Sequence, residues 1–175
     1  MSPPRSFALI PESHLEIYAD IKGLASGLQA KDLTLYASGG SGSWWSQYVG
    51  GRTVWGDLHA TLSKKLGEVG GANVKTLSLG KEANSWAITF TRNGTHCFGW
   101  NNVPAGLAEL LRSRSDAVVC FQFFTRNGTG FNSPTFIQDI VLSPWNHEHY
   151  FVLFRDGSYR YNLPKGWLNA EHKML

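Results

Sequence analysis

The sequence predicts a mainly β fold with short helices. It further predicts about three and a half tandem repeats, each a three-stranded meander followed by a helix, in a propeller-like or stacked array. Large apolar residues alternate with other residues along many short segments, as in strands with one buried face. Glycine-rich turn sequences separate these segments, and leucine-bearing stretches follow some of them. The 175 residues suffice to bury a core, so we expect one repeat domain over residues 1–175.

The stretch 85–111 holds the most complete unit. Residues 86–90 alternate as a strand does, and Asn93-Gly94 suits the positive φ angles of a tight hairpin turn. A second alternating run covers residues 96–100. Pro104 then suits the first turn of a helix whose leucines, Leu107, Leu110 and Leu111, form one stripe. This stretch therefore predicts strand, turn, strand and helix in that order.

Comparable units before and after this stretch divide the chain. We predict a loose tail over residues 1–9, a partial unit over 10–31, a first repeat over 32–72, a second over 73–115, a degenerate unit over 116–136 and a third repeat over 137–175. Trp44 and Trp86 open the second strands of the first two repeats, about 42 positions apart, a period typical of repeat arrays.

Four anchor positions recur in the three full repeats. They are Trp44, Trp86 and Tyr150 at the start of the second strand; Tyr48, Phe90 and Phe154 four residues later; the turn glycines Gly51, Gly94 and Gly157; and Trp55, Phe98 and Tyr161 four residues after each glycine. We assign the recurring aromatics Trp44, Trp86, Phe90, Phe98, Tyr150, Phe154 and Tyr161 to the core.

Composition excludes several classes of function. The formal net charge is +3 and the 16 Lys and Arg residues are scattered, which argues against nucleic acid as a partner. No stretch reaches the roughly 20 apolar residues of a membrane span. Pro11 and Glu12 interrupt the N-terminal apolar run, so no secretory signal is expected and a cytoplasmic location is predicted.

We interpret the two cysteines and the two Asn-Gly-Thr sequences as parts of the fold and not as functional sites. Cys97 and Cys120 lie in strand-like runs, which favours two buried reduced thiols, with a disulfide as the alternative. Asn93-Gly94-Thr95 and Asn127-Gly128-Thr129 match the glycosylation acceptor pattern, but without a secretory signal they are read as hairpin turns.

The repeated pattern is an alternating aromatic strand, an Asp/Asn-Gly turn, a short strand ending in Trp or Tyr, and a proline before a leucine helix. It resembles tandem repeats of about this length in proteins of fungi and other microbial eukaryotes. The resemblance covers residues 32–111 and 137–170. It implies a repeat architecture and no particular activity or site residue.

Candidate ligand-binding residues are those that the repeats do not share. Trp45 projects opposite to Trp44, and two further tryptophans stand beside polar loops. An exposed aromatic plate flanked by hydrogen-bonding groups binds sugars and other amphipathic ligands. The candidate set is Trp45, Trp100, Asn101, Asn102, Trp145, Asn146, His147 and His149.

His147 and His149 also form a His-x-His pattern of the kind some metal sites use. No third ligand follows from spacing, so the loop is read as polar, and no metal and no cofactor are predicted. Catalytic residues cannot be assigned, because no nucleophile motif or phosphate-binding glycine loop is present.

We therefore expect a non-enzymatic recognition module that binds a glycan or a protein partner through its aromatic and asparagine-bearing loops. The alternative is a small enzyme using the His147–His149 loop or a cleft between repeats. Because a few meanders cannot close a ring alone, a homodimer is also expected.

Overall fold

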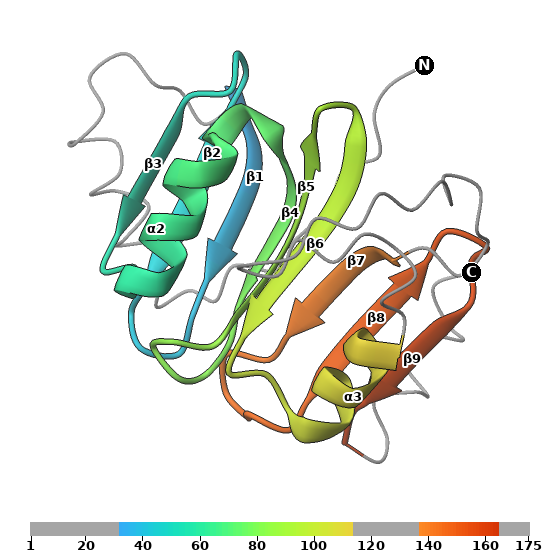
Figure 1. Cartoon of the computed structure of the whole chain (residues 1–175). Coiled ribbons are helices and arrows are strands. Elements are labelled where there is room, and N and C mark those ends of the chain that lie inside the picture. The colour runs from blue at the N-terminus through green and yellow to red at the C-terminus, as the bar shows by residue number, and fades with distance from the viewer. Residues whose placement is uncertain (1–31, 114–136, 165–175) are drawn as a thin grey trace.

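The computed structural model describes residues 32–113 and 137–164, in which it places nine strands, two α-helices and one short 3₁₀ helix (Figure 1). The elements are β1 (Leu33–Ser38), β2 (Trp44–Tyr48), β3 (Thr53–Gly56), α2 (Ala60–Val69), η3 (Gly71–Asn73), β4 (Val74–Leu79), β5 (Trp86–Arg92), β6 (Thr95–Asn101), α3 (Ala105–Ser113), β7 (Ile137–Leu142), β8 (Tyr150–Phe154) and β9 (Tyr159–Asn162).

The strands form three antiparallel three-stranded sheets, each a simple meander. The first sheet is β1-β2-β3, the second β4-β5-β6 and the third β7-β8-β9. A helix follows each of the first two sheets. The predicted mainly β fold with short helices is thereby confirmed. The predicted tail at 1–9, partial unit at 10–31 and degenerate unit at 116–136, which includes Cys120, lie outside the described residues, as does the end of the third repeat beyond residue 164.

Each sheet carries an irregularity at the same place. The pairing of the first and second strands shifts between Leu33 and Leu35, between Val74 and Thr76, and between Ile137 and Asp139. The residues paired just before the shift are Leu33 with Tyr48, Val74 with Phe90, and Ile137 with Phe154. An extra residue at a bulge fixes register, so the second-strand aromatics predicted as equivalent do share one register position.

The prediction for the third strands was wrong in one sheet. Trp55 pairs with Trp45 in the first sheet, and Tyr161 pairs with Phe151 in the third. In the second sheet the residue that matches Trp45 and Phe151 is Ala87, and its partner is Trp100 and not Phe98. The cause is hairpin length. The β5–β6 ladder continues to the pair Arg92 and Thr95, whereas the ladders of the other two hairpins end three residue pairs earlier. The fourth residue after the turn glycine, Phe98, therefore lies two residues before Trp100, which holds the matching register position.

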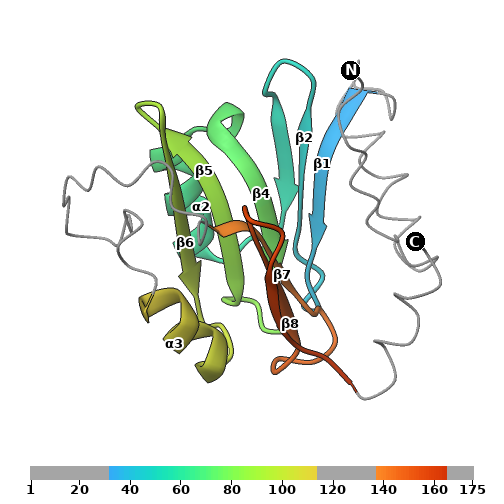
Figure 2. The same cartoon turned by 90° about the vertical axis from the view of Figure 1, so that its right-hand side faces the viewer.

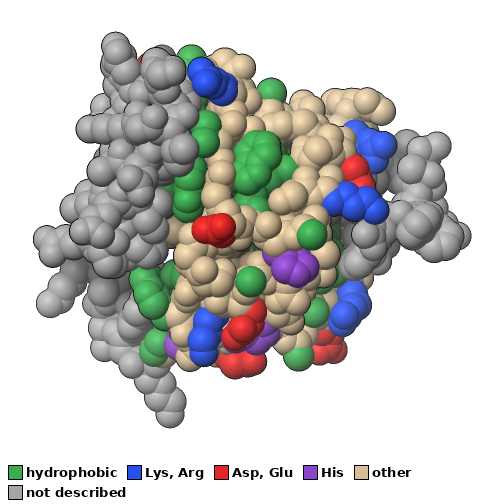
Figure 3. Space-filling model, turned by 90° about the vertical axis from the view of Figure 1, so that its left-hand side faces the viewer, with side chains coloured by type: hydrophobic (Ala, Val, Ile, Leu, Met, Phe, Trp, Pro, Cys, Tyr) green, Lys and Arg blue, Asp and Glu red, His purple; other side chains and the backbone are tan. Residues whose placement is uncertain are grey.

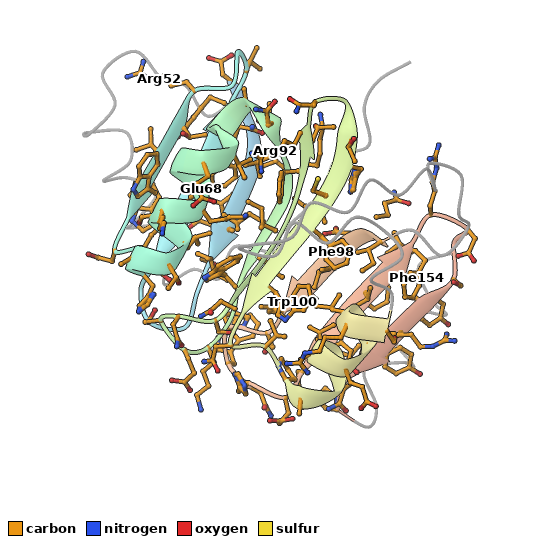
Figure 4. The ribbon with its side chains drawn as sticks, viewed as in Figure 1. Arg52, Glu68, Arg92, Phe98, Trp100 and Phe154 are labelled. Atoms are coloured by element: carbon orange, nitrogen blue, oxygen red, sulfur yellow. The ribbon has the colours of Figure 1, made fainter. Side chains whose placement is uncertain are left out.

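The second sheet lies between the other two, and its faces carry two separate cores. One core joins the first sheet, α2 and one face of the second sheet, and its largest fully buried member is Trp45. The other joins the opposite face, α3 and the third sheet, and includes Phe98, Phe154 and Leu107. Figure 1 shows α2 and α3 on opposite sides of the edge-on second sheet, and Figure 4 labels Phe98 and Phe154.

The first strands occupy the middle of the molecule, where β4 contacts both β1 and β7 (Figure 2). A hydrogen bond from the Leu142 amide to the Ser78 hydroxyl, 2.8 Å long, joins β7 to β4. Most of the predicted core aromatics are buried, and Tyr150 is half-buried. Tyr161 is the exception, because it lies on the exposed outer strand β9. Cys97 is buried, as predicted. Among the described residues, no helix is long and apolar enough to span a membrane.

Candidate ligand-binding site

Three loops meet at one end of the molecule, the lower end in Figure 1. They join the first and second strands of each sheet and comprise residues 39–43, 80–85 and 143–149, which we call the loop end. The Gly40 amide donates to the Gly80 carbonyl at 3.1 Å. A Cβ atom on Gly40 would lie 2.9 Å from the Lys81 carbonyl oxygen and still closer to that of Pro144. Gly40 thus lets all three loops touch through their backbones.

Asn84 connects the loop end to the residues after β6. The Asn101 side-chain amide donates to the Asn84 carbonyl at 2.7 Å, and that of Asn102 donates to Asn84 Oδ1 at the same distance. Asn102 has a φ of 45°, which asparagine tolerates better than most residues. The structure therefore brings the predicted Asn101 and Asn102 to the loop end. Sequence reasoning missed Asn84, whose only signal was its place in a polar loop.

The loop 143–149 is held by its own hydrogen bonds. The Ser143 hydroxyl accepts from the backbone amides of Trp145 and Asn146 at 3.2 and 3.1 Å. Asn146 Oδ1 accepts from the Glu148 amide at 2.9 Å, and Asn146 Nδ2 lies 3.2 Å from His149 Nε2. Within this hydrogen-bonded loop, Trp145 is 64% exposed. The loop presents a large ring to solvent beside an amide–imidazole pair.

The other two predicted tryptophans do not form exposed plates. Trp45 is fully buried, so its assignment to an exposed site was wrong. The central strand β2 is buried on both faces. The Trp45 side chain, which points away from Trp44, therefore enters the core that the first sheet shares with α2. Trp100 is half-buried and stacks on Phe98 with 5.7 Å between ring centroids. Figure 4 shows both rings on the side of the second sheet that faces the third.

The geometry of the two histidines differs from the predicted one. His147 lies in a turn and not on a strand, so His147 and His149 do not alternate along a strand as the His-x-His argument required. His147 Nδ1 is buried and has no hydrogen-bond partner in the part of the chain that the structure describes. Within that same part, no group of three His, Cys, Asp or Glu residues could hold a metal ion.

Titrating groups with shifted pKa values include two that lie away from the loop end. Burial raises the pKa of the Asp139 carboxyl on β7, an effect opposed by a hydrogen bond to Thr76. Burial also lowers the pKa of His96 on β6, and the nearby charges of Lys75 and Arg155 lower it further.

The surface does not concentrate charge of one sign on the side nearest β3. Figure 3 shows acidic and basic side chains interspersed there among hydrophobic and uncharged ones. Comparison of the chain with protein-family models, curated proteins and solved structures gives no match. The function of the protein is therefore inferred from the geometry of the loop end.

Proposed function

We propose that this protein is a non-enzymatic recognition module and that its loop end binds a glycan. The observation that carries the proposal is Trp145, a 64% exposed indole on a loop fixed by the Ser143 hydroxyl. These bonds hold the backbone at Trp145, and an indole has only two side-chain torsions to order when it stacks on the apolar face of a sugar. Asn146 and His149 supply hydrogen-bonding groups beside it.

The same proposal includes a repeat scaffold. Each described sheet is a meander with a bulge at one register position, and the first two are followed by a helix that packs between sheets. We infer that the sheets are copies of one meander–helix unit in a single repeat domain, as the resemblance to microbial-eukaryote repeats implies. Such a scaffold presents equivalent loops at one end, which suits multi-loop recognition.

A glycan array followed by titration calorimetry with the best oligosaccharide tests the proposal. Trp145→Ala should weaken binding at least tenfold, about 1.4 kcal/mol, because the stacking surface is removed. Trp55→Ala is the matched control, since Trp55 is also an exposed tryptophan but lies on β3 outside the loop end. The control should bind within about twofold of the wild type. A silent array, or equal losses in both variants, would contradict the proposal.

A further inference from the structure

The third sheet has an outward face of mainly apolar side chains that the described chain leaves open. Strand pairing places these side chains in two neighbouring rows on the same side of the sheet. We call them the aromatic face: Val141, Phe151 and Tyr161 in one row, and Asp139, Leu153 and Tyr159 in the other. Val141 and Tyr159 are 47% and 48% exposed, and Tyr159 stacks on Phe151 with 5.7 Å between ring centroids. A contiguous apolar surface of this kind normally packs against another segment.

The matching face of each other sheet packs against the helix that follows that sheet in the chain. Register places Trp45 and Ala87 at the position that Phe151 holds in the third sheet. Trp45 shares a core with the leucines of α2, and Ala87 shares a core with those of α3. In both described cases, therefore, this face is covered by the helix that comes next in the same chain.

The spacing of the chain brings the next segment to the same place after the third sheet. α2 begins four residues after β3 ends, and α3 begins four residues after β6 ends. β9 ends at Asn162, so the same spacing would start a helix at Gly166. The sequence 166–175, outside the described part of the chain, offers ten positions, as many as α2 has. Four residue steps span at most about 14 Å, which keeps this segment beside the third sheet.

The segment matches both helices at the position that meets the sheet. Leu62 is the third residue of α2 and Leu107 is the third residue of α3, and both are buried. Leu168 is the third residue of the sequence 166–175. Short amphipathic helices gain most of their stability from the surface on which they pack. A leucine at this position therefore favours packing on the aromatic face.

The departure at the seventh position coincides with a departure in the sheet. The seventh residue is Leu66 in α2 and Leu111 in α3, but His172 in the segment. Leu35 of β1 packs against the core that contains Leu66, and register places Asp139 in the third sheet where Leu35 stands in the first. An imidazole N–H can donate to a carboxylate. The polar residues of the sheet and of the segment are therefore complementary.

We propose that residues 166–175 form a third helix that docks on the aromatic face, with Leu168 over Phe151. The proposal rests on the inferred meander–helix unit and does not depend on glycan binding at the loop end. Because the segment is tethered beside the surface that it covers, docking is intramolecular and needs no second molecule. The aromatic face is then closed by the chain itself.

NMR of the full ¹³C,¹⁵N-labelled chain tests this proposal. Nuclear Overhauser contacts between the Leu168 methyl groups and the Phe151 ring are expected. The backbone amides of residues 170–174 should exchange with solvent at least about tenfold more slowly than those of an unstructured peptide with the same sequence, because a docked helix bonds them.

Substitutions in the segment provide a matched pair. Leu168→Glu should abolish the exchange protection, because a carboxylate cannot be buried against an apolar face without a partner. Ala170→Glu adds the same group at the fifth position, where Lys64 of α2 and Glu109 of α3 are exposed. It should leave the protection unchanged.

Substitutions in the sheets provide a second pair. Val141→Lys should also abolish the protection, because the lysine head would lie under the docked helix. Val49→Lys, at a 68% exposed valine in the β2–β3 turn, should leave it unchanged. Val141 is already half exposed, so the substitution leaves the fold intact, and the dispersion of the spectrum verifies this.

Four outcomes would overturn the proposal. Three are the absence of contacts between Leu168 and Phe151, exchange as fast as in the unstructured peptide, and equal loss of protection in Leu168→Glu and Ala170→Glu. The fourth is light scattering that shows a dimer which Leu168→Glu dissociates, since the segment would then dock on a second copy of the chain. Loss of glycan binding in Trp145→Ala is measured separately, so each proposal can fail without the other.

Discussion

Replacing Gly40 with alanine should separate the three loops of the loop end. The added Cβ would lie 2.9 Å from the Lys81 carbonyl oxygen and closer to that of Pro144, and both obstacles are backbone atoms that no rotamer change can move. The φ of Gly40 lies outside the left-handed region. Alanine therefore brings no conformational strain, and without the contacts it would be expected to stabilise the fold by about 0.4 to 1 kcal/mol.

The expected cost follows from the contacts. Overpacking against fixed atoms costs about 1 to 3 kcal/mol, and separation of the loops also loses the hydrogen bond from Gly40 to Gly80, worth about 1 kcal/mol. We expect a net loss of about 2 to 3 kcal/mol in the free energy of unfolding. For a chain of this size that corresponds to a drop of roughly 4 to 12 °C in Tm.

Urea unfolding followed by tryptophan fluorescence measures the loss. Gly67→Ala is the matched control, because a Cβ at Gly67 in α2 meets nothing within 4 Å. It should raise stability by about 0.5 to 1 kcal/mol, as alanine does in a helix interior. A Gly40→Ala protein as stable as the wild type would refute the convergence of the three loops.

Three further substitutions test the core and its titrating groups. Thr61→Val removes the hydroxyl that accepts from the Trp86 indole N–H at 3.1 Å. It should lower the free energy of unfolding by about 1 kcal/mol, seen as a lower urea midpoint with an unchanged m-value. Burial raises the pKa of Asp139, so the free energy of unfolding of the wild type should fall as pH rises above the unfolded pKa of about 4. Urea unfolding between pH 4 and 7 should show a smaller fall for Asp139→Asn. The same dependence of stability on pH in both proteins would contradict the burial argument. Burial lowers the pKa of His96, so wild-type stability should fall as pH drops below about 6.5, and His96→Gln should lessen that fall in the same series.

Local sequence patterns were sufficient to predict the strands and much of their register. Alternation of apolar residues predicted a strand over residues 86–90, and Asn93-Gly94 predicted a two-residue turn. In the structure β5 and β6 pair on either side of that turn, as far as Arg92 with Thr95. The second-strand aromatics were also aligned correctly, because equal spacing within a strand is preserved when a sheet forms.

What the sequence could not reveal depends on contacts between distant segments. Alternation showed that Trp44 and Trp45 point to opposite faces, but only the packing of α2 and the second sheet decides that the Trp45 side is covered. In the same way, Asn84 was missed because its partners Asn101 and Asn102 lie in another loop. On a central strand such as β2, both faces are covered, so alternation does not reveal an exposed side.

The outer-strand aromatics show that residues at one register position differ in exposure from sheet to sheet. Trp55, Trp100 and Tyr161 hold one register position, yet Trp55 and Tyr161 are exposed while Trp100 is half-buried. Trp55 is exposed although α2 packs against Trp45 in the core of the same sheet, so exposure of the outer aromatic does not show that a sheet lacks its helix. The inner residues decide the question. The matching inner residues are Trp45, Ala87 and Phe151; the first two are buried and Phe151 is half-buried, so the inner position of the third sheet is less covered than its two counterparts.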